Sequence, residues 1–216
     1  MINTITTGDA RELAKAIPDE SIDLIFTDPP YPKEYLPLYE WLAEEAARVL
    51  KPGGFLLTYA GNVHKYDVMM ALGHTQLTYF WDYITLHAGM GTMVWNRKTV
   101  ARHKSILAFV KGDGKPRTAV LGLWTGTGSD KRYHTWGQDE STARYYIDCF
   151  SSSRDIVWDP FCGGGTTPAV CKVLNRQFIA FEVDPDTADI ARKRLETVQP
   201  LLMPEEMEQL ALEATA

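Results

Sequence analysis

Short apolar runs that alternate with helical patterns constrain the fold of this chain most strongly. The runs at 22–27, 55–59 and 178–181 are bounded by turn residues, as buried strands are. Between them, segments such as 36–50 and 185–198 place apolar side chains at helical spacing. This alternation predicts an α/β fold with a parallel sheet and crossover helices. The other expected elements are strands at 2–7 and 156–158 and helices at 11–17, 142–150 and 167–174, with Asp9 and Asp184 as helix caps.

Length and composition bound the organisation of the chain. Its 216 residues suffice for one domain, and 45% hydrophobic and 23% charged residues are ordinary for a globular protein. Between 61 and 133 the pattern is less regular, so we expect one domain over 1–216 with extra strands and an inserted recognition region at 61–133. No stretch approaches the ~18 apolar residues of a membrane span, and the N-terminus does not resemble a secretory signal. A cytoplasmic protein without membrane contact is therefore expected.

Cysteine spacing and charge distribution narrow the kinds of site. Cys149, Cys162 and Cys171 match no common zinc pattern, so we expect reduced thiols and no metal site. The net charge of −6 argues against nonspecific binding of nucleic acid by the chain as a whole. Basic residues nevertheless gather between 95 and 117, where Asp113 is the single acid. They are Arg97, Lys98, Arg102, Lys104, Lys111, Lys115 and Arg117.

A glycine-rich segment, Asp159-Pro160-Phe161-Cys162-Gly163-Gly164-Gly165-Thr166-Thr167, joins an expected strand to an expected helix. Such a turn lets a nucleotide-like ligand approach the backbone closely. Pro168 replaces the third glycine of a dinucleotide site, and no lysine follows as in a phosphate-binding loop. Glu182 stands at the end of the next strand, where an acid can accept hydrogen bonds from both hydroxyls of a ribose. S-adenosylmethionine has that ribose and no phosphate, so it is the expected cofactor; a plain strand-to-helix turn is the alternative.

The tetrapeptide Asp28-Pro29-Pro30-Tyr31 ends another apolar strand and suits a base amino group. The lone pair of such a nitrogen is delocalised into the ring, so an enzyme can help by accepting its hydrogens and aiming the lone pair at a methyl sulfonium. Asp28 and the carbonyl of Pro29 would be the acceptors, the prolines fix the backbone, and Tyr31 offers a ring face for stacking. A base in a duplex must flip out of the stack to reach this site. A simple strand-terminating turn is the alternative.

In this order, the two motifs resemble those of the S-adenosylmethionine-dependent amino-methylating DNA methyltransferases of the permuted beta group, in which the catalytic tetrapeptide precedes the cofactor loop. Gly8-Asp9 and Leu50-Lys51-Pro52-Gly53-Gly54 also match segments of that family. The resemblance covers most of the chain. It implies a Rossmann-like fold whose sheet is doubly wound, mostly parallel and seven-stranded, with helices on both faces. It also implies that the catalytic residues are Asp28, Pro29, Pro30 and Tyr31.

The same resemblance implies a set of cofactor contacts. It suggests Asp9 near the adenine of the cofactor, Phe161 and Gly163 near its methionine and ribose, and Glu182 on the ribose hydroxyls. The segment from His134 to Gln138 looks like a variant of a family segment that completes the pocket, although the usual lysine and proline are missing; a packed corner is the alternative. The full expected set is Gly8, Asp9, Asp28, His134, Gln138, Asp159, Phe161, Cys162, Gly163, Gly165, Thr166, Glu182 and Val183.

The family places target recognition in the region that corresponds to 61–133. Basic side chains there would meet phosphates, and Asn96, Arg97 or Arg102 would read base edges. A solvated basic face is the alternative. Because the region is short, we expect a short target, a dimer or limited specificity. The expected DNA contacts are Asn96, Arg97, Lys98, Arg102 and Lys104.

The reaction expected from the resemblance is methyl transfer to the exocyclic amino group (N6) of adenine in DNA, since the Asp-Pro-Pro-Tyr version is the more usual one for adenine. Cytosine N4 is the open alternative. RNA or protein-amide methylation is less usual for this motif order, and a noncatalytic nucleic-acid-binding module is a further class. The resemblance suggests a modification enzyme of a bacterium or phage, with or without a restriction partner.

Overall fold

A large, mostly parallel sheet forms the centre of the computed structural model, which describes residues 1–86, 90–126 and 139–201. The strand order in the described chain is β1-β10-β9-β2-β3-β7-β4-β8. Its parallel part comprises β1 (Thr4–Thr7), β10 (Gln177–Glu182), β9 (Ile156–Asp159), β2 (Ile22–Thr27) and β3 (Leu50–Ala60). Its remaining strands are β7 (His103–Lys111) and β4 (Leu77–Leu86), each antiparallel to the strand before it in this order, and the short parallel strand β8 (Leu123–Thr125).

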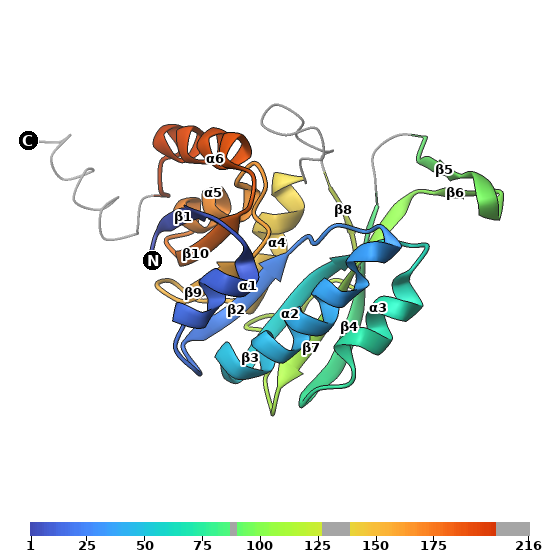
Figure 1. Cartoon of the computed structure of the whole chain (residues 1–216), viewed down its shortest axis with the longest axis horizontal. Coiled ribbons are helices and arrows are strands. Elements are labelled where there is room, and N and C mark those ends of the chain that lie inside the picture. Colours follow the sequence, from blue (N-terminus) through green and yellow to red (C-terminus); the bar gives the residue numbers. More distant parts are fainter. Residues whose placement is uncertain (87–89, 127–138, 202–216) are drawn as a thin grey trace, which may run out of the picture.

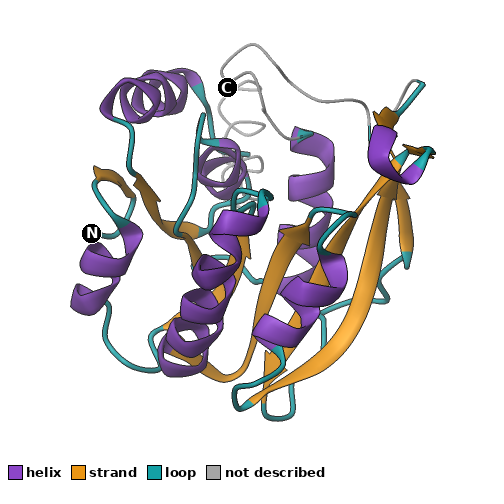
Figure 2. Ribbon diagram, turned by 45° about the vertical axis from the view of Figure 1, so that its right-hand side comes forward, coloured by secondary structure: helices purple, strands orange, loops and turns teal. Residues whose placement is uncertain are grey.

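Helices cover both faces of this sheet (Figure 2). One face carries α1 (Ala10–Leu13), α2 (Leu36–Val49) and α3 (Lys65–Leu72), with single 3-10 turns at Ala14–Ala16 and Lys33–Tyr35. The other carries α4 (Glu140–Phe150), α5 (Thr166–Val173) and α6 (Pro185–Thr197). The expected α/β, doubly wound fold is confirmed; the three-residue strand β8 adds an eighth strand to the seven expected.

Both helix caps expected from the sequence are present. The carboxylate of Asp9 accepts a hydrogen bond of 2.9 Å from the backbone nitrogen of Arg11, and that of Asp184 accepts one of 2.7 Å from Thr187. Each bond satisfies a backbone donor that has no partner within its own helix. The caps thus start α1 and α6 directly after β1 and β10, so both connections are short.

Alternating side chains of the strands build two cores, one on each face of the sheet. In β3, the side chains of Phe55, Leu57 and Tyr59 enter the core beneath α4 and α5, whereas Leu56 and Ala60 enter the core beneath α2. Burying a large apolar side chain contributes about 1.5–3 kcal/mol to the free energy of unfolding. The central strands are therefore apolar on both faces, which explains why the sequence shows them as continuous apolar runs.

The described part of the region 61–133 contributes α3 and several strands to the body of the molecule, together with a hairpin that projects from it. Its strands β4 and β7 pair with the rest of the main sheet, so they belong to the body of the molecule. Its hairpin, β5 (Thr92–Val94) and β6 (Thr99–Ala101), forms a separate two-stranded sheet joined by a 3-10 turn at Trp95–Arg97. This hairpin projects from the body (Figure 1). In the described ranges, every helix is too short or too polar to cross a membrane.

Candidate active site

The carboxyl ends of β2 and β9 meet at one edge of the sheet. These strands are parallel neighbours, with Ile25 opposite Trp158. From β2 the chain continues toward β3, and from β9 it continues toward β10 on the opposite side. Ligands of open α/β sheets bind at such a reversal of strand order. Because Asp28 directly follows β2 and Asp159 ends β9, the two motifs of the sequence lie at this point.

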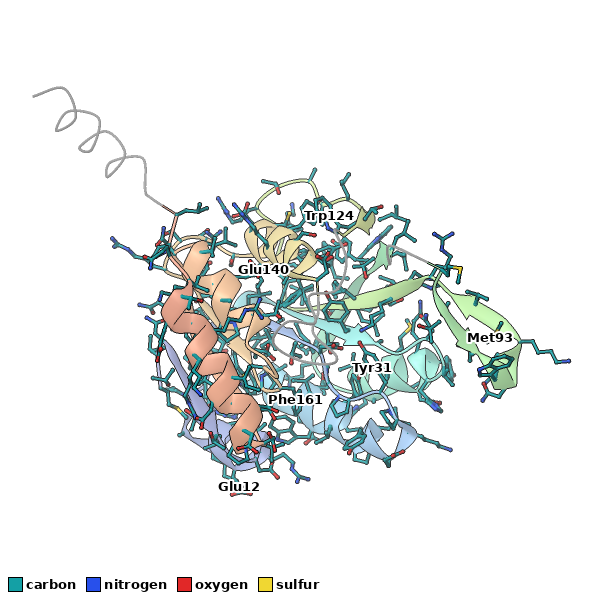
Figure 3. All side chains as sticks on the ribbon, turned by 90° about the horizontal axis from the view of Figure 1, so that it is seen from above. Glu12, Tyr31, Met93, Trp124, Glu140 and Phe161 are labelled. Carbon is teal, nitrogen blue, oxygen red and sulfur yellow. The ribbon has the colours of Figure 1, made fainter. Side chains whose placement is uncertain are left out.

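One open cavity of about 740 Å³ contains both motifs. Figure 3 looks onto this end of the molecule and shows Tyr31 and Phe161 near the middle. Of the residues expected in the site, the cavity is lined by Gly8, Asp9, Asp28, Pro29, Pro30, Tyr31, Asp159, Phe161, Cys162, Gly163, Thr166, Glu182 and Val183. His134 and Gln138 lie outside the described residues. The roles assigned to these residues stay predictions, but the structure brings the described ones together.

Asp159 anchors the glycine-rich loop from inside the protein. Only 4% of the residue is exposed, and its carboxylate accepts hydrogen bonds from Thr27 Oγ1 at 2.7 Å and from the backbone nitrogen of Phe161 at 3.1 Å. Burial raises the pKa of this carboxyl to about 6, against the opposing effect of its hydrogen bonds. The bond to Thr27 ties the end of β2 to the end of β9, so the two halves of the cavity share one rigid floor.

Glu182 and the loop hold each other in position. The Oε2 atom of Glu182 accepts a hydrogen bond of 2.9 Å from the backbone nitrogen of Gly163, and its Oε1 atom accepts one of 3.0 Å from Asp184. Gly163 has φ of +48°, and a β carbon there would meet no atom within 4 Å, so its side-chain direction is open space. This carboxylate is therefore fixed at the rim of the cavity, next to a backbone that a ligand can approach closely.

Gly165, expected among the cofactor contacts, is outside the lining of the cavity. It has φ of +78°, and a β carbon there would lie 2.9 Å from Cβ of Ala191. Glycine is needed because α5 starts in a left-handed turn that packs directly against α6. Its part in the site is thus to shape the loop.

The tetrapeptide is held from below by the helix that follows it. The hydroxyl of Tyr31 donates a hydrogen bond to Oδ1 of Asp28, and burial together with that carboxylate raises the pKa of Tyr31 well above its usual value. Tyr39 of α2 donates a long hydrogen bond of 3.5 Å to the carbonyl of Pro29. Gly61 permits this arrangement, because a β carbon there would lie 2.9 Å from Cβ of Tyr31. The carboxylate and the aromatic ring thus face the cavity as one unit.

The lining of the cavity includes Thr27, Tyr59, Lys104 and Thr167, which are outside the expected cofactor and catalytic set. Thr27 and Thr167 lie beside Asp159, and the buried ring of Tyr59 lies at the end of β3. Their signal in the sequence is position alone, since each adjoins the carboxyl end of a parallel strand. Lys104, expected to contact DNA, also lines the cavity, and its Nζ atom is 4.0 Å from Oδ2 of Asp28.

The other expected DNA contacts lie on or beside the hairpin. Asn96 and Arg97 are in its turn, Lys98 follows in a left-handed conformation with φ of +49°, and Arg102 links β6 to β7. All four are exposed. Figure 3 shows Met93 on this hairpin, to one side of Tyr31. The hairpin therefore presents its basic residues beside the cavity rather than inside it.

The chain is similar to known DNA methyltransferases. A family model described as DNA methylase, N6_N4_Mtase, matches residues 114–193. The type II methyltransferase M.BamHI of Bacillus amyloliquefaciens is 29% identical over 90% of this chain, which spans 57% of that relative's length. Two solved structures share the fold. PvuII DNA methyltransferase, described as cytosine-N4-specific, has a TM-score of 0.78 at 19% sequence identity, and the match covers 95% of this chain and 90% of the PvuII chain. The M1.HpyAVI–SAM complex has a TM-score of 0.75 at 24% sequence identity, and the match covers 89% of this chain and 98% of the M1.HpyAVI chain.

These similarities agree with the motifs and with the cavity that joins them. The matched region 114–193 includes the glycine-rich loop and Glu182, and the similarity to M.BamHI covers 90% of the chain. The expected resemblance and cofactor class are confirmed. The family model and the type II relatives thus make this chain similar, over most of its length, to the DNA amino-methyltransferases of the N6-adenine/N4-cytosine group.

Proposed function

We propose that this protein transfers a methyl group from S-adenosylmethionine to N6 of adenine in DNA. The observation that carries the proposal is that one cavity joins Asp28, Pro29 and Tyr31 to the glycine-rich loop and Glu182. A base amino group held at the tetrapeptide and a methyl donor held at the loop would then share one cavity. Bringing two reactants together in this way removes much of the entropic barrier to reaction.

The residues of the loop fit the cofactor. Gly163 leaves open space where a side chain would stand, and Glu182, held beside it by two backbone nitrogens, would accept hydrogen bonds from ribose hydroxyls. The lining contains four acids, Asp9, Asp28, Asp159 and Glu182, against Arg11 and Lys104, which suits a cationic ligand without phosphate. Bound there, the cofactor supplies an electrophilic methyl group on a sulfonium.

The tetrapeptide would position the target nitrogen. Asp28 and the carbonyl of Pro29 accept the two amino hydrogens, which turns the nitrogen lone pair toward the methyl donor. Tyr31 keeps Asp28 oriented through its hydroxyl and offers its ring to the base. When the nitrogen has gained the methyl group it is cationic and acidic, so Asp28 takes or relays its proton. Each carboxylate oxygen has two lone pairs, so the bond to Tyr31 leaves capacity for this task.

Cytosine N4 is the second candidate target. PvuII methyltransferase, whose fold this chain shares, is described as specific for that nitrogen. Cytosine also has an amino group on a flat ring, so the same acceptors would serve it. Our preference for adenine depends on the Asp-Pro-Pro-Tyr form of the tetrapeptide.

The remaining parts of the proposal concern the partners. We propose that duplex DNA lies across the cavity mouth, with Asn96, Arg97, Lys98 and Arg102 of the hairpin region on its backbone and base edges; this narrows target recognition within 61–133 to the part that projects from the sheet. A restriction-modification role, a homodimer and a cytoplasmic location belong to the proposal as well.

The proposal is tested by incubating the purified protein with unmethylated DNA and methyl-labelled S-adenosylmethionine, followed by nucleoside analysis of the digested DNA. Label on N6 of adenine is expected. Label on N4 of cytosine would keep the mechanism and replace the base. Binding of the cofactor without any labelled DNA would contradict the proposal and direct attention to RNA or protein substrates.

A further inference from the structure

The direction of β7 carries Lys104 into the cavity. This strand is antiparallel to β3, with Ser105 opposite Ala60, so β7 starts where β3 and the other parallel strands end. The hydroxyl of Thr85 donates a long hydrogen bond of 3.4 Å to the carbonyl of Lys104, which fixes the backbone from the β4 side. Alternation along β7 places Lys104 on the same face as Ile106, which is opposite Tyr59. The lysine is therefore built into the sheet.

The ammonium of Lys104 lies among the groups proposed to hold the base. Its Nζ atom is 4.0 Å from Oδ2 of Asp28, 4.9 Å from the centroid of the Tyr31 ring and 5.6 Å from that of Tyr59. The side chain of Lys104 is only 23% exposed. Lys98 on the hairpin is exposed, as we expect of a lysine that contacts phosphates. Lys104 is thus in position to contact a base at the tetrapeptide.

Asp28 and Lys104 together present one acceptor and one donor to the same part of the cavity. The Hoogsteen edge of adenine is complementary, since it has an N6–H donor next to the N7 acceptor. Asparagine and glutamine read that edge in DNA with the same combination of acceptor and donor. Cytosine has a similar pair of groups on its Watson–Crick edge, where the N3 acceptor neighbours N4–H, so this complementarity concerns how the base is held and not which base is chosen. An acceptor and an ammonium side by side therefore suit the N6–N7 edge of an adenine held at the tetrapeptide.

We propose that Lys104 positions the target adenine by donating a hydrogen bond to its N7 while Asp28 accepts one from N6. This inference rests on the proposed function and names the group that contacts the ring of the base. It gives Lys104 a role that differs from the phosphate contacts of the hairpin. Since a charged hydrogen bond is strong, removal of its acceptor should lower kcat/KM about 10- to 100-fold.

The test compares two DNA substrates made by amplification, one natural and one with 7-deazaadenine in place of every adenine. The analogue lacks the N7 acceptor and keeps the N6 amino group. Other contacts to N7 in the duplex are lost equally for any variant, so the informative quantity is the ratio of kcat/KM on the two substrates. We expect this ratio to be about 10- to 100-fold larger for the unaltered protein than for Lys104→Met. Single-turnover rates at high enzyme concentration keep the slow reactions measurable.

Three controls separate recognition from folding. Lys104→Arg keeps a charged donor, so its ratio of kcat/KM on natural DNA to kcat/KM on 7-deazaadenine DNA should remain large. Lys15→Met removes an exposed lysine that pairs with Glu12 outside the cavity, and should match the unaltered protein. Thermal stabilisation of Lys104→Met by S-adenosylmethionine would show an intact fold.

Equal ratios for the unaltered protein and Lys104→Met would overturn the inference and leave the proposed function in place. Failure of the unaltered protein to methylate natural adenine would overturn the proposed function itself, and the inference with it.

Discussion

Replacement of Asp159 by asparagine tests the electrostatics at the floor of the cavity. In the unfolded chain its carboxyl has a pKa near 3.8, and burial raises this to about 6 in the folded protein. The folded state therefore binds the proton more tightly, so the unfolding free energy decreases as pH rises from about 4 to 6. The difference of about two pKa units corresponds to about 3 kcal/mol, of which about 2–3 kcal/mol develops between pH 4 and pH 7.

Asparagine does not titrate, and its amide oxygen can still accept the bonds from Thr27 and the backbone of Phe161. We therefore expect the stability of the unaltered protein relative to Asp159→Asn to fall by about 2–3 kcal/mol between pH 4 and pH 7. Urea unfolding at a series of pH values, followed by tryptophan fluorescence, gives both stabilities, and titration of all other groups cancels in their difference. A difference that stays constant over this range would refute the reasoning, because Asp159 would then ionise as it does in the unfolded chain.

Two further predictions concern the cofactor and DNA. Glu182→Gln should weaken binding of S-adenosylmethionine by about 1.5–3 kcal/mol, measured by calorimetry, because a charged acceptor for the ribose becomes neutral; unchanged affinity would remove Glu182 from the site. Replacing both Arg97 and Lys98 by alanine should make the fall of log K for DNA with log salt concentration less steep by about 2, while cofactor affinity stays intact. An unchanged slope would contradict phosphate contacts by the hairpin.

The sequence predicted the parallel half of the sheet well, because burial on both faces leaves a continuous apolar run. The strand at 22–27 was located to the residue, and Asp9 and Asp184 cap their helices as expected. Both motifs lie on these elements, so their meeting at one edge follows from parallel strand order. The sequence therefore predicted most of the cavity lining before any contact was known.

The antiparallel half was harder to predict, for physical reasons. In β4, a register shift between Tyr79 and Trp81 interrupts the alternation of side chains. Leu77 and Tyr83 are therefore buried in different cores, on opposite faces of the sheet, while Tyr79 and Trp81 between them are exposed. The aromatic runs of 61–133 consequently gave no clear boundary between sheet and insertion. The position of Lys104 depends on the register of β7 against β3, which periodicity alone does not fix. Its place inside the cavity is thus a result of the structure.

The central claim is that Asp28 acts on the base and the glycine-rich loop binds the cofactor within one cavity. The most direct measurement compares Asp28→Ala with the unaltered protein in two assays, methyl transfer to DNA and thermal stabilisation by S-adenosylmethionine. We predict that kcat falls by at least about 100-fold, as for loss of a transition-state partner, while the stabilisation by the cofactor persists. Full activity of Asp28→Ala would contradict the account, and loss of both properties would contradict the separate roles assigned to Asp28 and to the loop.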